Sequence, residues 1–81
     1  MSTFRLGDRV RIAESEHVCV YMFGHVGTIE AVYPARAWES TVFGPMLYRV
    51  KFDEPCPQAT PTWSPLTSCG GLADFDLEPV A

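Results

Sequence analysis

The spacing of glycine and proline is the feature that most limits the folds open to this chain. Six glycines and seven prolines are spread through 81 residues, which leaves few stretches long enough for a helix of several turns. Glycine suits tight turns because it adopts positive φ at little cost, and proline ends a strand because it has no N–H. The sequence therefore favours short strands joined by turns over long helices.

The clearest strand signal is the stretch GHVGTIEAVYP, residues 24–34. Gly24 and Gly27 suit a turn or bulge where a strand begins, because glycine tolerates backbone conformations that strain other residues. The residues that follow alternate with the two-residue period of a strand. Ile29, Ala31 and Tyr33 are expected on one face, and Thr28, Glu30 and Val32 on the other. Pro34 is expected to end the strand.

Three further segments show the same alternation, at residues 6–13, 46–55 and 73–80. The side chains expected to point into a core from these segments are Val10, Ile12, Tyr48, Val50, Phe52, Phe75 and Leu77. The connecting segments are less regular. Residues 14–23 are expected to form a loop that leads into a strand, and residues 35–40 suit one helical turn.

The longest stretch without a strand pattern is residues 54–71, which contains four prolines. We predict a proline-rich irregular loop here. Loops of that length are uncommon inside a compact domain, and they are usually functional or ordered by a partner.

These segments together predict an all-β fold, a small SH3-like barrel of about five short antiparallel strands with two long irregular loops. Residues 1–81 are expected to form a single domain, because a chain of 81 residues is the length of one small domain. Hydrophobic residues make up 47% of it, as in globular proteins. A domain of this size buries roughly 60% of its unfolded surface and has little stability to spare. Closure into a barrel would remove the exposed strand edges.

The charge of the chain disfavours nucleic-acid binding. The formal net charge is −4, and all six basic residues lie before position 52, so the C-terminal third carries only acidic groups. Nonspecific affinity for nucleic acid comes from Lys and Arg that neutralise phosphates. Arg9, Arg11, Arg49 and Lys51 could still form one local basic patch, so a nucleic-acid-binding barrel remains the least favoured alternative.

The sequence also indicates a compartment. The opening residues are polar and lack the apolar region of a signal peptide, and no apolar run approaches the roughly 20 residues of a membrane span. Three cysteines, an odd and widely spaced number, do not suggest a disulfide framework. We therefore expect a cytoplasmic protein with reduced thiols and no membrane contact.

A metal site or a catalytic centre within this chain is not expected. His17, Cys19, His25, Cys56 and Cys69 supply ligand types, but structural zinc sites normally contain closely spaced ligand pairs on turns. Cys69, in the stretch TSCGG, would need an activating base or a helix N-terminus to act as a nucleophile. Sequence alone shows neither.

Aromatic residues are the candidates for binding a partner. Nine Phe, Tyr and Trp residues at positions 21–75 are too many for a small barrel to bury easily. Those expected to lie outside the core, and so to anchor an interface, are Trp38, Phe43, Trp63, Tyr21 and Phe23. Aromatic residues in loops either anchor interfaces or pack over the ends of a barrel, and the sequence leaves both open for Trp38 and Trp63.

Four stretches in this order carry a family resemblance: GDRVRI, GHVGTIEAVYP, YRVKFDEP and the closing DLEPV. Together they resemble the C-terminal half of the β subunit of nitrile hydratases and thiocyanate hydrolases. The match covers most of the chain outside the two long loops. Each stretch alone also occurs in unrelated SH3-like domains, so their order and the final Leu-Glu-Pro carry the resemblance.

The resemblance implies a specific role. In that family low-spin iron or cobalt lies on the α subunit, in a cysteine cluster, and the β subunit docks and supplies arginines to it. The family's His-X-Arg stretch is similar to residues 17–23 here, with Cys19 in place of the arginine. The resemblance therefore implies a barrel subunit of a hetero-oligomer that is not catalytic by itself, has no cofactor of its own and binds a metal-bearing α-type subunit.

A second group of proteins shares the same signals. The barrel subunit of photosystem I that docks ferredoxin, and the variable chain of ferredoxin-thioredoxin reductase, are short SH3-like proteins that begin with a Gly-X-X-Val-Arg strand. Similarity to these implies a stand-alone adaptor that docks a redox or other protein partner. Both interpretations predict an accessory, protein-binding domain, and they differ in the partner.

Overall fold

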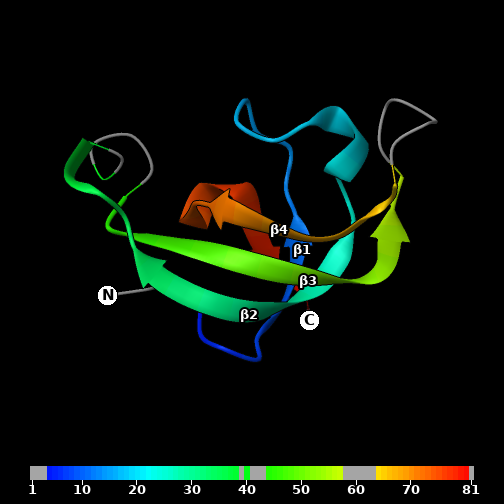
Figure 1. Cartoon of the computed structure of the whole chain (residues 1–81), viewed down its shortest axis with the longest axis horizontal. Coiled ribbons are helices and arrows are strands. Elements are labelled where there is room, and N and C mark those ends of the chain that lie inside the picture. Colours follow the sequence, from blue (N-terminus) through cyan, green and yellow to red (C-terminus); the bar gives the residue numbers. More distant parts are fainter. Residues whose placement is uncertain (1–3, 39, 41–43, 58–63, 81) are drawn as a thin grey trace.

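The computed structural model describes residues 4–38, 40, 44–57 and 64–80. They form one antiparallel sheet of five strands in the order β4-β3-β2-β1-β5 (Figure 1). The strands are β1 Arg9–Ile12, β2 Val26–Pro34, β3 Met46–Cys56, β4 Leu66–Leu72 and β5 Leu77–Pro79. Two short 3-10 helices accompany them, η1 Val20–Met22 and η2 Asp74–Asp76. The expected all-β fold of about five short antiparallel strands is confirmed.

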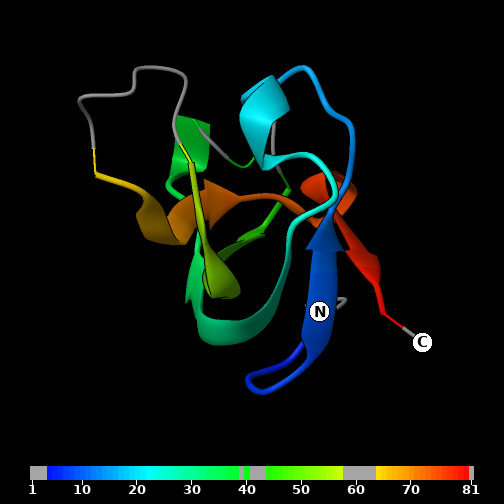
Figure 2. The ribbon, with the colours of Figure 1, turned by 90° about the vertical axis from the view of Figure 1, so that its right-hand side faces the viewer.

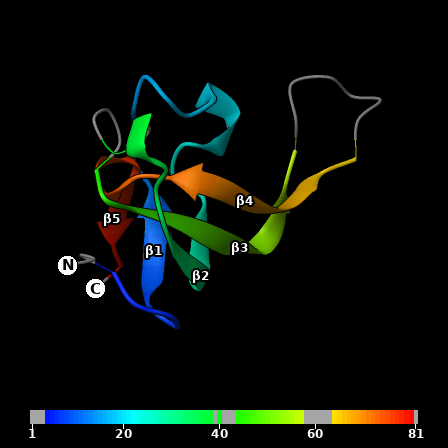
Figure 3. The ribbon, with the colours of Figure 1, turned by 60° about the vertical axis from the view of Figure 1, so that its left-hand side comes forward.

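The last strand returns beside the first. β1 pairs with β2 on one side and with β5 on the other, and β5 lies next to β1 in both side views (Figures 2 and 3). β2 and β3 then pair over most of their length, and β4 follows β3. Within the described ranges no pairing joins β4 to β5, so these two strands form the edges of the sheet.

The core lies on one face of the sheet, as the alternation predicted. The inward side chains of β1 and β3 are almost completely buried, and η1 and the residues before β1 add to them. The buried residues of this core are Phe4, Val10, Ile12, Val18, Met22, Ile29, Tyr48, Val50, Phe52, Cys56, Leu72 and Leu77. The outward residues Arg9, Arg11, Arg49 and Lys51 are exposed, whereas Leu47, which precedes the inward Tyr48 on β3, is buried outside this core.

The expected alternation of the second strand is wrong beyond Ile29. The pairs Ile29–Val50 and Ala31–Arg49 enclose a β-bulge at Glu30. A bulge inserts one unpaired residue, which reverses the faces of every residue after it. Val32 therefore packs against the core, while the hydroxyl oxygen of Tyr33 accepts an exposed hydrogen bond from the N–H of Gly71.

The predicted irregular loop over residues 54–71 is wrong at both of its ends, and residues 58–63 lie outside the described residues. β3 continues to Cys56, and β4 occupies the last part of this segment. The β4 sequence, LTSCGGL, contains two glycines and few strong strand formers, so its local signal indicates a turn. Pairing with β3, a contact between distant parts of the chain, makes it a strand. Residues 14–23 form a connection that contains the single turn η1 and leads into β2, as expected.

The prediction that Phe75 belongs to the core is wrong, because η2 interrupts the alternation. A 3-10 helix has three residues per turn, so the two-residue period of a strand does not hold there. Phe75 is 48% exposed, whereas Asp76 is only 1% exposed and Leu77 is buried as expected. An oxygen of Asp76 accepts the N–H of Ala73 at 3.0 Å, which holds this turn.

Candidate functional site

The predicted partner-binding residues lie in different environments. Trp38 is 65% exposed, on a helical turn in which the N–H of Ser40 donates to the carbonyl of Arg36 at 2.9 Å. Tyr21 and Phe23 are half-buried and pack against the core, so they stabilise the fold as well as reaching the surface. Phe43 and Trp63 lie outside the described residues.

Large apolar side chains are exposed on the segments that lie above β2 and β3. The fractions are 76% for Val20 on η1, 65% for Trp38 and 48% for Phe75 on η2. Figures 1 and 3 place η1, the helical turn and η2 all on this upper side, whereas the turn at residues 5–8 lies below the sheet. We call Val20, Trp38 and Phe75 the upper apolar residues. The sequence analysis did not single out Val20.

Ring contacts hold part of this upper side together. The rings of His17 and Phe75 lie 5.4 Å apart, which connects the segment before η1 to η2. Another histidine, His25, packs its ring against the core residue Phe52 at 5.9 Å. His25 also borders a shallow cavity of about 280 Å³ between the start of β2 and the end of β3, which Asp53 and Glu54 line as well.

Burial keeps two of the three thiols, Cys56 and Cys69, in the protonated form. Cys56 is buried and its S–H donates to the carbonyl of Tyr21 at 3.3 Å, and burial raises the pKa of this thiol. Burial is also the main reason why the pKa of Cys69 is raised, so this thiol stays protonated at neutral pH and is a weak nucleophile. Across the part of the chain that the structure describes, no three His, Cys, Asp or Glu side chains are placed to hold a metal ion.

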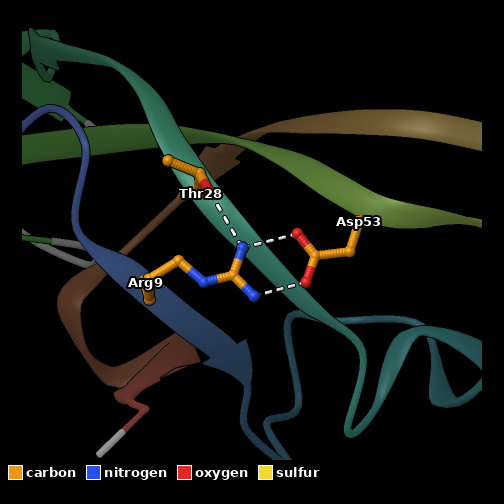
Figure 4. A network of polar contacts seen from close by, with 3 residues as sticks. All are labelled: Arg9, Thr28 and Asp53. Carbon is orange, nitrogen blue, oxygen red and sulfur yellow. Dashed lines mark hydrogen bonds and ion pairs between the residues drawn. The ribbon is translucent and has the colours of Figure 1, made fainter.

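Two of the four residues of the predicted basic patch are neutralised by acidic residues. Arg9 of β1 donates from both terminal nitrogens to Asp53 of β3 and also to the hydroxyl of Thr28 of β2 at 3.1 Å, which links three strands (Figure 4). These hydrogen bonds hold the pKa of Asp53 below its usual value. Arg11 donates to Glu78 of β5 at 3.0 Å. The patch is therefore reduced to Arg49 and Lys51.

Arg49 lies against a gap that the sequence did not reveal. Between the pairs Tyr48–Leu72 and Val50–Cys69, β4 has one residue more than β3, so that Arg49 faces two glycines. A Cβ atom on Gly70 would stand 3.6 Å from Arg49 Nε and 3.5 Å from the hydroxyl oxygen of Tyr33. The only local signal for this arrangement is the Gly-Gly pair itself, which the sequence analysis assigned to a turn.

Comparison with known proteins does not add to these observations. No helix in the described ranges has the length and apolar character needed to span a membrane. Searches against protein-family models, curated proteins and solved structures found no match to this chain.

Proposed function

We propose that this chain is a small, non-catalytic SH3-like barrel subunit that docks to a partner protein. The strand order supports the barrel, because β1 pairs with both β2 and β5, so the last strand lies beside the first. The curl of the sheet in Figure 2 and the single core shared by all five strands are also typical of small barrels.

The exposure of Trp38 is the observation that carries the docking role. A tryptophan with 65% of its surface in water leaves much apolar area unburied, and burying that area against a partner lowers the free energy of the complex. Tryptophan is also enriched among the residues that dominate binding at interfaces. Val20 and Phe75 are exposed on the same upper side, although Figure 1 shows η1 at the opposite end from the helical turn, so a partner that covers all three would contact a broad surface.

The partner that we propose is a metal-bearing α-type subunit, as the resemblance to nitrile hydratase and thiocyanate hydrolase β subunits implies. In such a hetero-oligomer the iron or cobalt belongs to the partner, and this chain shapes and covers the partner's surface. Cys19, which stands where the resemblance implies an arginine, is exposed. The role proposed here is therefore docking, with no direct part in the chemistry.

Native mass spectrometry of the complex isolated from its source, with iron and cobalt analysis of the same sample, tests this proposal. The expected result is a complex of this chain with a subunit that contains one of these metals. Trp38→Ser should reduce recovery of the complex, whereas Leu6→Ser, at a residue 67% exposed on the opposite side of the sheet, should not. Isolation of the chain alone, or of a complex without either metal, would contradict the proposed partner.

The second candidate is a stand-alone adaptor that docks a redox protein or another partner. It is favoured by the acidic C-terminal third, together with the ion pairs that neutralise Arg9 and Arg11. The same two ion pairs weaken the case for a nucleic-acid-binding barrel. Crosslinking from residues 54–71 distinguishes the candidates, since crosslinks only to an electron carrier would favour the adaptor.

A further inference from the structure

The outer face of the sheet carries two cations that the described acidic residues do not neutralise. Arg49 and Lys51 lie two residues apart on β3, and both are exposed. Asp53 pairs with Arg9 and Glu78 pairs with Arg11, and neither ion pair reaches Arg49 or Lys51. Side chains two residues apart on a strand share a face and are separated by roughly 7 Å. The face therefore presents two positive charges at a defined spacing.

A small gap beside Arg49 places its guanidinium next to the hydroxyl of Tyr33. Tyr33, Arg49 and Gly70 define what we call the Tyr33–Arg49 cradle. Because Gly70 has no Cβ, the hydroxyl of Tyr33 and the guanidinium of Arg49 border the same space above the backbone of β4. The extra residue in β4 creates this approach, and Gly71 provides it with a positive φ of 71°.

Among the described residues, the polar groups of the cradle are hydrogen-bond donors that meet no acceptor. The Tyr33 oxygen accepts the N–H of Gly71 at 2.7 Å, which leaves the hydroxyl proton available to donate. Within the described residues neither this proton nor the guanidinium of Arg49 meets an acceptor. An Arg fork matches the two oxygens of a carboxylate, and such charge-assisted hydrogen bonds are stronger than neutral ones. The cradle thus has the chemistry of a carboxylate site.

We propose that the Tyr33–Arg49 cradle binds a carboxylate side chain from an extended acidic segment of a partner protein. A second carboxylate two residues further along that segment lies the same distance from the first as Lys51 does from Arg49. It would therefore lie beside Lys51. The inference rests on the proposed docking function and adds the chemistry of one contact. It places that contact on the outer face of β3 and β4, separate from the upper apolar residues.

The occupant is proposed to be a different protein, and three acidic residues near the ends of the sheet are already engaged or buried. In the acidic C-terminal segment Asp76 is buried and Glu78 is bound by Arg11, and Asp53 is bound by Arg9. A net charge of −4 opposes association of two copies. The same net charge repels nucleic acid, whose phosphates could otherwise meet the Arg fork.

Titration of the labelled chain with two short peptides, followed by ¹H–¹⁵N NMR, tests the proposal. The first probe is the acetylated and amidated peptide Gly-Glu-Thr-Glu-Gly, whose carboxylates lie two residues apart, and the second has Gln in place of Glu. The expected result is weak binding of the Glu peptide, with shifts concentrated at Tyr33, Arg49, Gly70 and Gly71. Equal shifts with the Gln peptide would overturn the proposal.

Gly70→Ala is the sharpest variant, because it fills the cradle without changing any charge. The new Cβ would make ordinary contacts of 3.5 to 4.0 Å, so the fold should be retained. Gly70→Ala and Arg49→Gln are each expected to weaken binding of the Glu peptide by about tenfold. Arg5→Gln, which removes one charge from the turn below the sheet, should change it by less than about twofold.

Other outcomes separate the alternatives. The proposal would be overturned if Gly70→Ala left the affinity for the Glu peptide unchanged. It would also be overturned by concentration-dependent dimerisation of the chain that Arg49→Gln abolishes, or by tighter binding of a uridine octamer at the same residues. If the peptide fails to bind while Trp38→Ser still reduces recovery of the complex, the cradle is wrong and the docking function stands. If the peptide binds and no complex is found, the docking function fails instead.

Discussion

At the scale of single residues, the structure assigns roles to charged groups that sequence alone could not pair. Arg9 and Asp53 are 44 positions apart, and yet their side chains share two hydrogen bonds. Thr28 on the intervening strand accepts a third hydrogen bond from Arg9, so one arginine connects β1, β2 and β3 (Figure 4). Both partners of the ion pair are close to half exposed, and its clearest signature is therefore a shifted titration and not a large gain in stability.

We predict that Arg9→Gln raises the pKa of Asp53, because the hydrogen bonds that favour the carboxylate are lost. The native pKa lies below the unfolded value, so the pair contributes stability above the unfolded pKa and loses it as the pH falls through the folded pKa. NMR titration of the Asp53 carboxyl carbon measures this. Arg11→Gln serves as the control and should leave the Asp53 midpoint nearly unchanged; equal midpoints in the wild type and Arg9→Gln would show that the ion pair does not form.

At the scale of elements, the two glycines near the start of β2 serve different purposes. Gly24 has a positive φ of 81°, as expected for a turn, and its Cβ position is open. Gly27 is buried where β2 crosses β3, and a Cβ there would lie 2.6 Å from Val50 Cγ1 and even closer to a backbone oxygen of Lys51. Gly27 is therefore required by the close approach of two strands, which the sequence pattern does not distinguish from a turn.

We predict that Gly27→Ala lowers the free energy of unfolding by about 3 kcal/mol, the upper end of the usual cost of overpacking. The clash involves backbone, which can move only if the pairing of β2 with β3 is distorted. Urea denaturation measures the change, and Gly70→Ala is the matched control because its new Cβ meets only ordinary contacts. Similar stabilities of the two variants would contradict the close packing of β2 on β3.

At the scale of the whole molecule, one core holds the five strands together, and η2 decides which C-terminal residues join it. Alternation alone could not show this, because a single 3-10 turn changes which side chains point inward. The strands β1, β2 and β3 were predictable since their signal is local: successive side chains point to opposite faces. β4, the bulges in β2 and β4, and the Tyr33–Arg49 cradle were not, because each depends on contacts between segments distant in sequence.

We predict that Phe52→Ala lowers the free energy of unfolding by about 3 kcal/mol or more, because Phe52 is only 5% exposed. Phe75→Ala should cost less than about 1 kcal/mol, since nearly half of that side chain lies in water. Thermal unfolding followed by circular dichroism compares the two variants. A larger loss for Phe75→Ala would restore the expectation from alternation and contradict the position of η2.

The sequence by itself determined the all-β class, the strands β1 to β3 and the apolar face on which Tyr48, Val50 and Phe52 are buried. The periodicity of a strand and the restrictions of glycine and proline act over a few residues, so they can be read from neighbours in the chain. Tertiary structure alone decided that LTSCGGL forms an edge strand, that Arg9 is neutralised and that Arg49 is not. The physical reason is that strand pairing and ion pairing depend on distances between remote segments, which only the folded chain establishes.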